Sequence, residues 1–285
     1  MAVQGMQDIK RRIRSVNSTM QITRAMELVS SAKLRRARER LQQTRPYFNT
    51  ISDTIEEIIS STRGIQHEFL ISRQVKKVCY IVITADRGLA GGYNTNAIRA
   101  AVDHMDDREG VSVITIGSKA RDYFRKGNYE IGGEFLQISE DPSYSDAQNI
   151  GKLAIELYRQ GLVDEVNLIY TEFISTISHQ PRLVKLLPVE GIANGEREAM
   201  ELMDYEPSPE EVLDFLIPKY IESMIYGGLI ESSVSEQGAR RVAMESATDN
   251  ATEMIEELEL QYNRARQASI TQEIAEIVGG AEALE

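Results

Sequence analysis

The N-terminal stretch of the chain contains nothing that would interrupt an α-helix, and this constrains the fold more than any other feature. Between Met6 and Arg45 there is neither glycine nor proline. The backbone is therefore free to form one helix across these residues, which at a rise of 1.5 Å per residue would be about 60 Å long. A helix of that length extends beyond any small core, so it needs a partner along its whole length.

A second helical stretch closes the chain. After Pro218 there is no further proline, and only Gly227, Gly228 and Gly238 disfavour helix before Gly279–Gly280, a span of about 90 Å if unbroken. We expect the glycine pair to end this helix as its C-cap. Six residues recur on one side at steps of three and four, and the alanines among them would allow close approach by a partner helix: Ala247, Ala251, Met254, Leu258, Tyr262 and Ala265.

The two helical ends carry opposite charge although the whole chain is acidic. Residues 1–45 hold 11 Lys and Arg against 3 Asp and Glu, and residues 219–285 hold 5 against 13, within a net charge of −12. Two long amphipathic helices of opposite charge predict an antiparallel coiled coil. Because the apolar positions slip out of strict heptad register, we expect a narrow seam and a rod that is completed by packing into something larger.

The middle of the chain alternates between strand and helix. Apolar runs at 75–84, 111–116 and 165–173 predict buried strands, and 94–103, 118–126 and 146–160 predict helices. This layout indicates a mostly parallel sheet. The predicted fold is therefore α/β, a long antiparallel coiled coil of N- and C-terminal helices plus a Rossmann-like central α/β domain. The expected parts are an N-terminal coiled-coil helix 1–60, the central domain 75–190, a linker 191–209 and a C-terminal coiled-coil helix 210–285.

No pattern in the sequence predicts a catalytic, cofactor or metal site. The turn from Asp86 to Asn94 follows a strand and precedes a helix, yet its G-x-x-G-G spacing matches neither standard phosphate loop. A tight turn whose glycines supply positive φ is the favoured interpretation, with nucleotide binding as the alternative. His67, His104 and His179 lack metal-ligand spacing, and the only cysteine, Cys79, lies in an apolar run where burial is expected.

The basic arm before Arg45 leaves two further partners to consider, the phosphates of nucleic acid and an anionic membrane surface. An acidic partner helix explains the same charges, and no aromatic residue for base stacking precedes Tyr47. We therefore expect no nucleic acid partner. No apolar run is long enough to span a bilayer and no signal peptide is recognisable, so the expected location is the cytoplasm.

Three sequence blocks resemble one family. Gln261 to Leu284 reads QYNRARQASITQEIAEIVGGAEAL, Asp8 to Leu34 reads DIKRRIRSVNSTMQITRAMELVSSAKL, and TADRGLAGGYN surrounds the central turn. Together they resemble the gamma subunit of F-type ATP synthase. The resemblance implies a non-catalytic rotor shaft inside a ring of alpha and beta subunits. Its foot would sit with the epsilon subunit on the membrane ring of c subunits, and proton flow would drive it. It also implies a peripheral location on the cytoplasmic face of the cell membrane, with membrane association through the c-ring only and no cofactor.

The resemblance further implies which residues contact the surrounding ring. In the first helix the family's contact segment falls on Ile22 to Met26, with Arg24 and Met26 as candidates, and in the last helix the candidates are Arg240, Arg266, Gln267, Thr271 and Glu273. The alternative is that some of these residues only stabilise the coiled coil. A free-standing coiled-coil scaffold and a nucleotide-using enzyme built on the central domain are the competing function classes. The apolar residues Ile270, Ile274, Ile277 and Val278 predict that the C-terminal tip is inserted in the ring.

Overall fold

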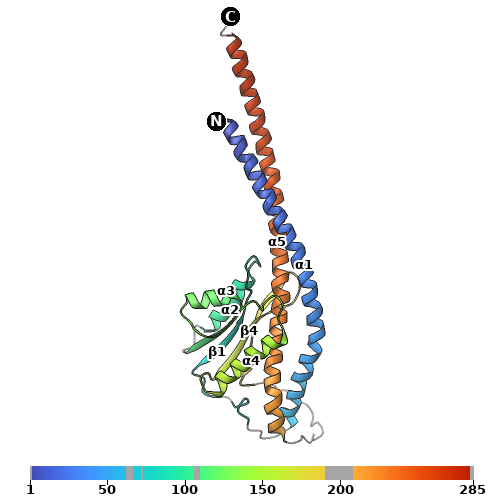
Figure 1. Ribbon diagram of the computed structural model, residues 1–285, viewed down its shortest axis with the longest axis vertical. Helices are drawn as coiled ribbons and strands as arrows, with labels where there is room; N and C mark the ends of the chain where they lie inside the picture. The colour runs from blue at the N-terminus through green and yellow to red at the C-terminus, as the bar shows by residue number, and fades with distance from the viewer. Residues whose placement is uncertain (1, 62–66, 72, 106–109, 190–207, 283–285) are drawn as a thin grey trace. The chain divides into compact units, whose positions relative to one another are not determined.

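The computed structural model describes residues 2–61, 67–71, 73–105, 110–189 and 208–282 (Figure 1). They form two compact units. Unit 1 comprises residues 1–30 and 241–285, and unit 2 comprises residues 31–240. Two long helices, α1 (Ala2–Ser61) and α5 (Pro209–Glu282), contribute to both units. Most of the predicted linker, residues 191–209, lies outside the described residues.

Both long helices extend further than the glycines and prolines suggested. α1 runs through Pro46, and α5 runs through Pro218. A proline inside a helix costs about 3 kcal/mol. Burial of other side chains of the same helices offsets this cost, since Ile55 of α1 and Ile217 of α5 are both fully buried. The predicted C-cap at Gly279–Gly280 is wrong, because α5 continues to Glu282. Glycine disfavours a helix by only about 1 kcal/mol relative to alanine, so it does not by itself end one.

In unit 1 the two helices pair antiparallel, as predicted. The hydroxyl oxygens of Thr23 and Thr248 lie 2.7 Å apart, and Thr252 Oγ1 donates to Met20 Sδ at 3.6 Å. Further towards the N-terminus, Lys10 Nζ lies 5.5 Å from the centroid of the Tyr262 ring. Earlier residues of α1 therefore meet later residues of α5, and the two chain ends lie at the same end of the pair (Figure 1).

Engineered disulfides test this register. Thr23→Cys combined with Thr248→Cys should form a crosslink in high yield, because the two side-chain oxygens are already in contact. Thr23→Cys combined with Thr271→Cys is the matched control and should give none. The native Cys79 does not compete, since burial raises the pKa of its thiol to about 12. Non-reducing gel electrophoresis reads the outcome, and equal yields for the two pairs would contradict the antiparallel register.

Unit 2 is built on a five-stranded sheet in the order β3-β2-β1-β4-β5. β1 (Val78–Ile83), β2 (Val111–Ile116), β3 (Glu130–Phe135) and β4 (Glu165–Phe173) are parallel, and β5 (His179–Leu187) joins the edge antiparallel to β4. The prediction of a mostly parallel sheet is confirmed. All four parallel strands end at the same edge, which collects the loops that follow them.

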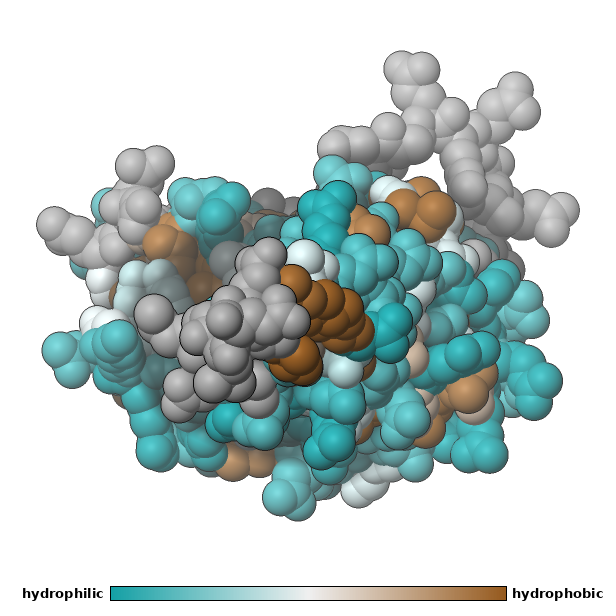
Figure 2. Space-filling view, turned by 90° about the horizontal axis from the view of Figure 1, so that it is seen from above, coloured by the Kyte–Doolittle hydropathy of each residue, from teal (hydrophilic) through white to brown (hydrophobic). Residues whose placement is uncertain are grey.

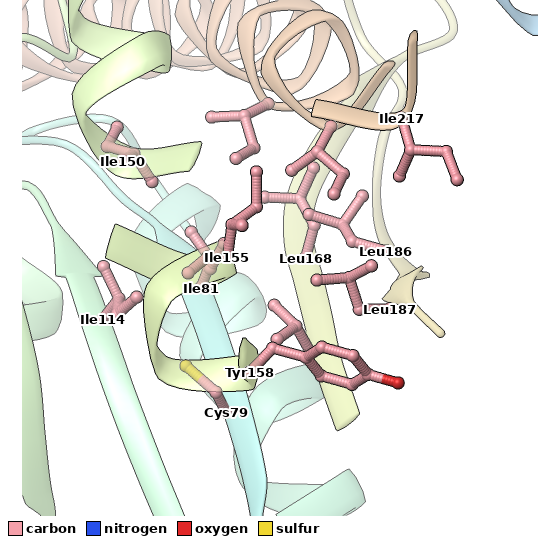
Figure 3. Close-up of a cluster of buried hydrophobic side chains, with 14 of the residues drawn as sticks. Cys79, Ile81, Ile114, Ile150, Ile155, Tyr158, Leu168, Leu186, Leu187 and Ile217 are labelled. Atoms are coloured by element: carbon pink, nitrogen blue, oxygen red, sulfur yellow. The ribbon is translucent and has the colours of Figure 1, made fainter. Parts of the chain in front are cut away.

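Helices cover both faces of the sheet. α2 (Tyr93–Met105) and α3 (Ser118–Lys126) pack on one face, where Ala101, Met105 and Phe124 meet Tyr80. α4 (Tyr144–Arg159) packs on the other face, where Ile150 and Tyr158 are buried against the sheet (Figure 3).

The same core includes the first half of α5, which contributes the buried residues Leu213, Ile217, Ile221, Ile225 and Leu229. The C-terminal helix is therefore part of the α/β core before it joins unit 1. On its other side, α5 packs against α1 within unit 2. Leu34 and Leu41 of α1 form a buried cluster with Ile230 and Val234 of α5.

Candidate functional site

The turn between β1 and α2 is a tightly bonded structure at the carboxyl edge of the sheet. Leu89 and Gly91 adopt positive φ, at 63° and 54°, which confirms the expected tight turn and adds a non-glycine residue in the left-handed region. Asn94 Oδ1 accepts a hydrogen bond from the backbone N–H of Ala85 at 2.8 Å. The turn is thus held by the helix that follows it.

Asp86 connects this turn to two other loops. Its carboxylate accepts hydrogen bonds from the backbone N–H and the hydroxyl of Ser118, both at 3.0 Å, and from the hydroxyl of Ser139 at 2.9 Å. Ser118 follows β2 and Ser139 follows β3. One carboxylate therefore ties together the loops at the ends of three parallel strands.

These bonds make the stability of unit 2 sensitive to acid. Burial alone would raise the pKa of Asp86, but hydrogen bonds from Gln137, Ser139 and Ser118 lower it below the ordinary value of 3.8. A lowered pKa in the folded state stabilises the fold above the ordinary pKa, and that stabilisation is lost as the pH falls through the folded value. Asp86→Asn should therefore be destabilising at neutral pH. Its deficit should shrink below about pH 4. Thermal unfolding across that range measures this, and a constant deficit would contradict it.

Arg240 is placed inside unit 2. Its side chain is 7% exposed, and its Nη1 donates to Glu236 Oε1 at 2.6 Å while its Nη2 donates to the backbone oxygen of Gly88 at 3.3 Å. Burial raises the pKa of Glu236, and the Arg240 guanidinium opposes that shift. This candidate contact residue is therefore engaged with its own chain, in contact with the Asp86–Asn94 turn.

The other candidate contact residues lie in unit 1 and fall into two groups. Arg24 is exposed and Met26 is half-buried, and they follow Thr23, which lies beside Thr248. Arg266 lies 18 residues beyond Thr248 in α5, or about 27 Å along the helix. The structure therefore separates the α1 group from the second group, whose residues are all exposed: Arg266, Gln267, Thr271 and Glu273.

Unit 1 also exposes large apolar side chains. On α1, Leu28 is 66% exposed, and Ile22 and Val29 are exposed as well. On α5, Ile277 is 72% exposed, and it is accompanied by Met254, Leu260, Ile270, Ile274 and Val278. Figure 2 shows hydrophobic side chains on a surface that is otherwise mostly hydrophilic. Exposed apolar side chains in such number on a two-helix unit indicate a surface that a partner covers.

The described residues show neither a metal centre nor a membrane span. Within this part of the chain, no cluster of His, Cys, Asp and Glu could hold a metal ion. None of the described helices combines the length and the apolar character needed to cross a membrane.

Comparison with known proteins identifies the family. The model of the family described as ATP synthase matches residues 5–284. The ATP synthase gamma chain of Alkaliphilus metalliredigens is 68% identical, with 98% of this chain and 99% of that protein covered. The chain belongs to the ATP synthase gamma-chain family. It is a rotor subunit without catalytic activity of its own.

Another family member and solved structures of similar fold extend the comparison. The chain is 50% identical to the sodium ion specific ATP synthase gamma chain of Acetobacterium woodii, over 99% of each protein. Its fold is similar to a chain in a cryo-EM structure of the Euglena gracilis mitochondrial ATP synthase, with a TM-score of 0.74 at 21% identity, covering 99% of this chain and 95% of that one. A central stalk and c-ring structure from Tetrahymena thermophila contains another similar chain, with a TM-score of 0.63 at 23% identity, covering 79% and 99%.

The sequence patterns did not predict that buried polar side chains of α5 bind the helix to the rest of unit 2. The run from Glu231 to Arg240 reads ESSVSEQGAR, and most of it is buried. A polar run inside a long, otherwise amphipathic helix was the available signal. Periodicity alone assigns such residues to a solvated face, because it carries no information about the loops that surround them.

Proposed function

We propose that unit 1 stands inside a ring of alpha and beta subunits, with the apolar side chains of α1 and α5 facing that ring. The observation that carries this proposal is the set of exposed apolar residues on a two-helix unit, headed by Leu28 and Ile277. Each such side chain stabilises a complex by about 1.5–3 kcal/mol when fully buried. A sleeve of surrounding subunits would bury them on several sides, which one flat partner could not do.

The polar candidates would then provide directional contacts to the ring. Arg24, Arg266 and Gln267 are exposed and free to reach carboxylates and backbone groups of neighbouring subunits. Because Arg24 and Arg266 belong to groups about 27 Å apart along the helix pair, they would meet the ring at two levels. Met26, Thr271 and Glu273 would take part beside them. The competing role, stabilisation of the chain itself, fits Arg240 best, because its guanidinium donates to Glu236 and to the backbone oxygen of Gly88.

Unit 2 would form the foot of the rotor. We infer that it sits on the membrane c-ring together with epsilon, at the cytoplasmic face of the cell membrane, and that membrane association is through the c-ring only. The similar Tetrahymena chain comes from a structure of a central stalk with its c-ring, which supports this placement. Proton flow through the ring would turn unit 2 and unit 1 together.

The asymmetry of the helix pair would couple rotation to the nucleotide sites of the beta subunits. An antiparallel helix pair is not symmetric about its long axis, so three beta subunits around it would each face different side chains. Each contact pattern would favour one conformation of the neighbouring nucleotide site, and rotation would exchange the patterns. The chain would thus bias catalytic sites without entering them.

Rotation in a reconstituted complex tests this proposal. Alpha, beta and this chain should assemble, and a bead attached to unit 2 should turn when ATP is added. The chain purified alone should neither bind nor hydrolyse ATP. Assembly of an equally active complex without the chain, or ATP hydrolysis by the chain alone, would overturn the proposal.

A further inference from the structure

The part of α5 that crosses the carboxyl edge of the sheet is polar where the rest of its buried face is apolar. Between Ile217 and Leu229 the buried face is made mainly of isoleucine and leucine. From the next turn onwards, side chains that are usually exposed are buried almost completely: Ser232, Ser233, Ser235, Glu236, Gln237 and Arg240. Burial of so many polar groups is costly unless they make specific hydrogen bonds.

Two of these serines bind the backbone of one residue of β4. The N–H of Thr171 donates to Ser232 Oγ at 3.1 Å, and Ser235 Oγ donates to the carbonyl oxygen of Thr171 at 3.1 Å. The last paired residue between β1 and β4 is Ile169. Thr171 therefore extends past the end of β1, and the helix supplies the hydrogen bonds that a neighbouring strand would otherwise provide.

Two further bonds join α5 to the other loops of the same edge. Ser233 Oγ donates to the backbone oxygen of Glu140 at 3.1 Å, and Arg240 donates to the backbone oxygen of Gly88. Glu140 lies between β3 and α4, and Gly88 follows β1. α5 is thus bonded to backbone groups after β1, after β3 and near the end of β4.

The close approach of α5 to β5 at Gly238 limits the rotation of the helix. A Cβ atom at this position would lie 2.9 Å from Cε1 of His179. The helix therefore meets the start of β5 without room for a side chain, and rotation about its own axis would drive a neighbouring residue into the histidine ring.

At this edge of the sheet, the second long helix of unit 2 reaches the loops through side-chain ion pairs. Lys33 and Arg40 of α1 form ion pairs with Glu140 and Asp141. A cavity of about 300 Å³ remains between α1, the segment before α4 and α5. The Arg40–Asp141 pair is exposed, and exposed ion pairs contribute little, about 0–1 kcal/mol each. At this edge, α5 is therefore the helix that bonds to backbone groups, whereas α1 makes ion pairs between side chains.

We propose that Ser232, Ser235 and Arg240, with their partners Thr171 and Gly88, form a torsional joint that makes α5 turn with the sheet. This inference rests on the proposed rotor function. The hydrophobic effect is not directional, so a face of isoleucine and leucine fixes the rotation of a helix only through the fit of its side chains. Hydrogen bonds to fixed backbone groups are directional. Because successive residues of a helix are rotated by about 100°, a slip of one residue would break all of these bonds together. Ser232, Ser235 and Arg240 are therefore positioning residues. They affect the coupling of rotation to catalysis by fixing the orientation of α5.

The double variant Ser232→Ala with Ser235→Ala tests the joint in the assembled complex. The control is Ser223→Ala, since Ser223 is equally buried in α5 and its hydroxyl makes no hydrogen bond within the described part of the chain. Both variants should assemble and hydrolyse ATP at the wild-type rate. In the double variant, torsional stiffness between unit 2 and the ring, and ions pumped per ATP hydrolysed, should fall by roughly half, because two of the directional bonds are gone. In Ser223→Ala both should stay at the wild-type value.

The two readouts distinguish a torsional joint from a purely structural role for the serines. A structural role alone would lower the thermal stability of the isolated chain while leaving stiffness and pumping in the assembled complex unchanged, and that result would overturn the joint. Equal losses in the double variant and in Ser223→Ala would also overturn it. Absence of rotation in the wild-type complex would instead count against the proposed rotor function.

Discussion

Replacing Arg240 by alanine should lower the free energy of unfolding of the chain by about 3–5 kcal/mol, because the substitution leaves a buried carboxylate without its partner. Glu236 is fully buried, and Arg240 is its hydrogen-bonded cation at 2.6 Å. The substitution would also remove one of the hydrogen bonds that hold the turn after β1. Urea unfolding of the purified chain, followed by circular dichroism, measures the change.

Two further variants make that result interpretable. Arg24→Ala is the matched control, since Arg24 is exposed and its loss should change stability by less than about 0.5 kcal/mol. Arg240→Met combined with Glu236→Gln removes both charges and should be clearly less destabilising than Arg240→Ala. If Arg240→Ala instead behaves like Arg24→Ala, with normal stability and a defect only in the assembled complex, the guanidinium acts on a partner subunit and the internal pair is unimportant.

Ending the chain after Ala268 should weaken its retention in the catalytic ring at least about tenfold, because it removes four exposed apolar residues and each stabilises a complex by about 1.5–3 kcal/mol when buried. These residues are Ile270, Ile274, Ile277 and Val278. Folding of unit 2 should be unchanged, since it contains none of them. Dissociation of the labelled chain from assembled complex gives the retention, and thermal unfolding of the isolated chain gives the folding control.

A substitution control separates the apolar side chains from the length of the helix. Gln272→Ala with Glu276→Ala changes exposed polar residues of the same turns and keeps the full helix. It should leave retention close to the wild-type value, while Ile274→Ser with Ile277→Ser should reproduce much of the truncation. Wild-type retention and wild-type torque in the truncated chain would show that the residues after Ala268 make no important contact with the ring.

The contact between the two long helices was predictable because it depends on local patterns. Long stretches free of proline allow helix, small residues such as Ala251 mark a close seam, and both signals can be read without knowing the rest of the fold. The sheet was predictable for the same reason, since runs such as Val78–Ile83 are buried on both faces and carry apolar residues throughout. The ends of helices were less predictable, as Gly279 and Pro218 show, because burial elsewhere along a helix can outweigh a local preference.

The sequence by itself therefore determined the two long helices, their antiparallel direction and the α/β layout between them, since periodicity, glycine and proline placement and strand composition act over short distances. Only the tertiary structure decided that the first half of α5 belongs to the core of the α/β unit, that Arg240 is buried against Glu236 and Gly88, and that Ser232 and Ser235 hold Thr171. The backbone groups that the two serines bind are more than 60 residues away in the chain. A serine that bonds a distant strand and a serine that faces water look alike in sequence, because the free energy that distinguishes them arises only when the fold removes the water.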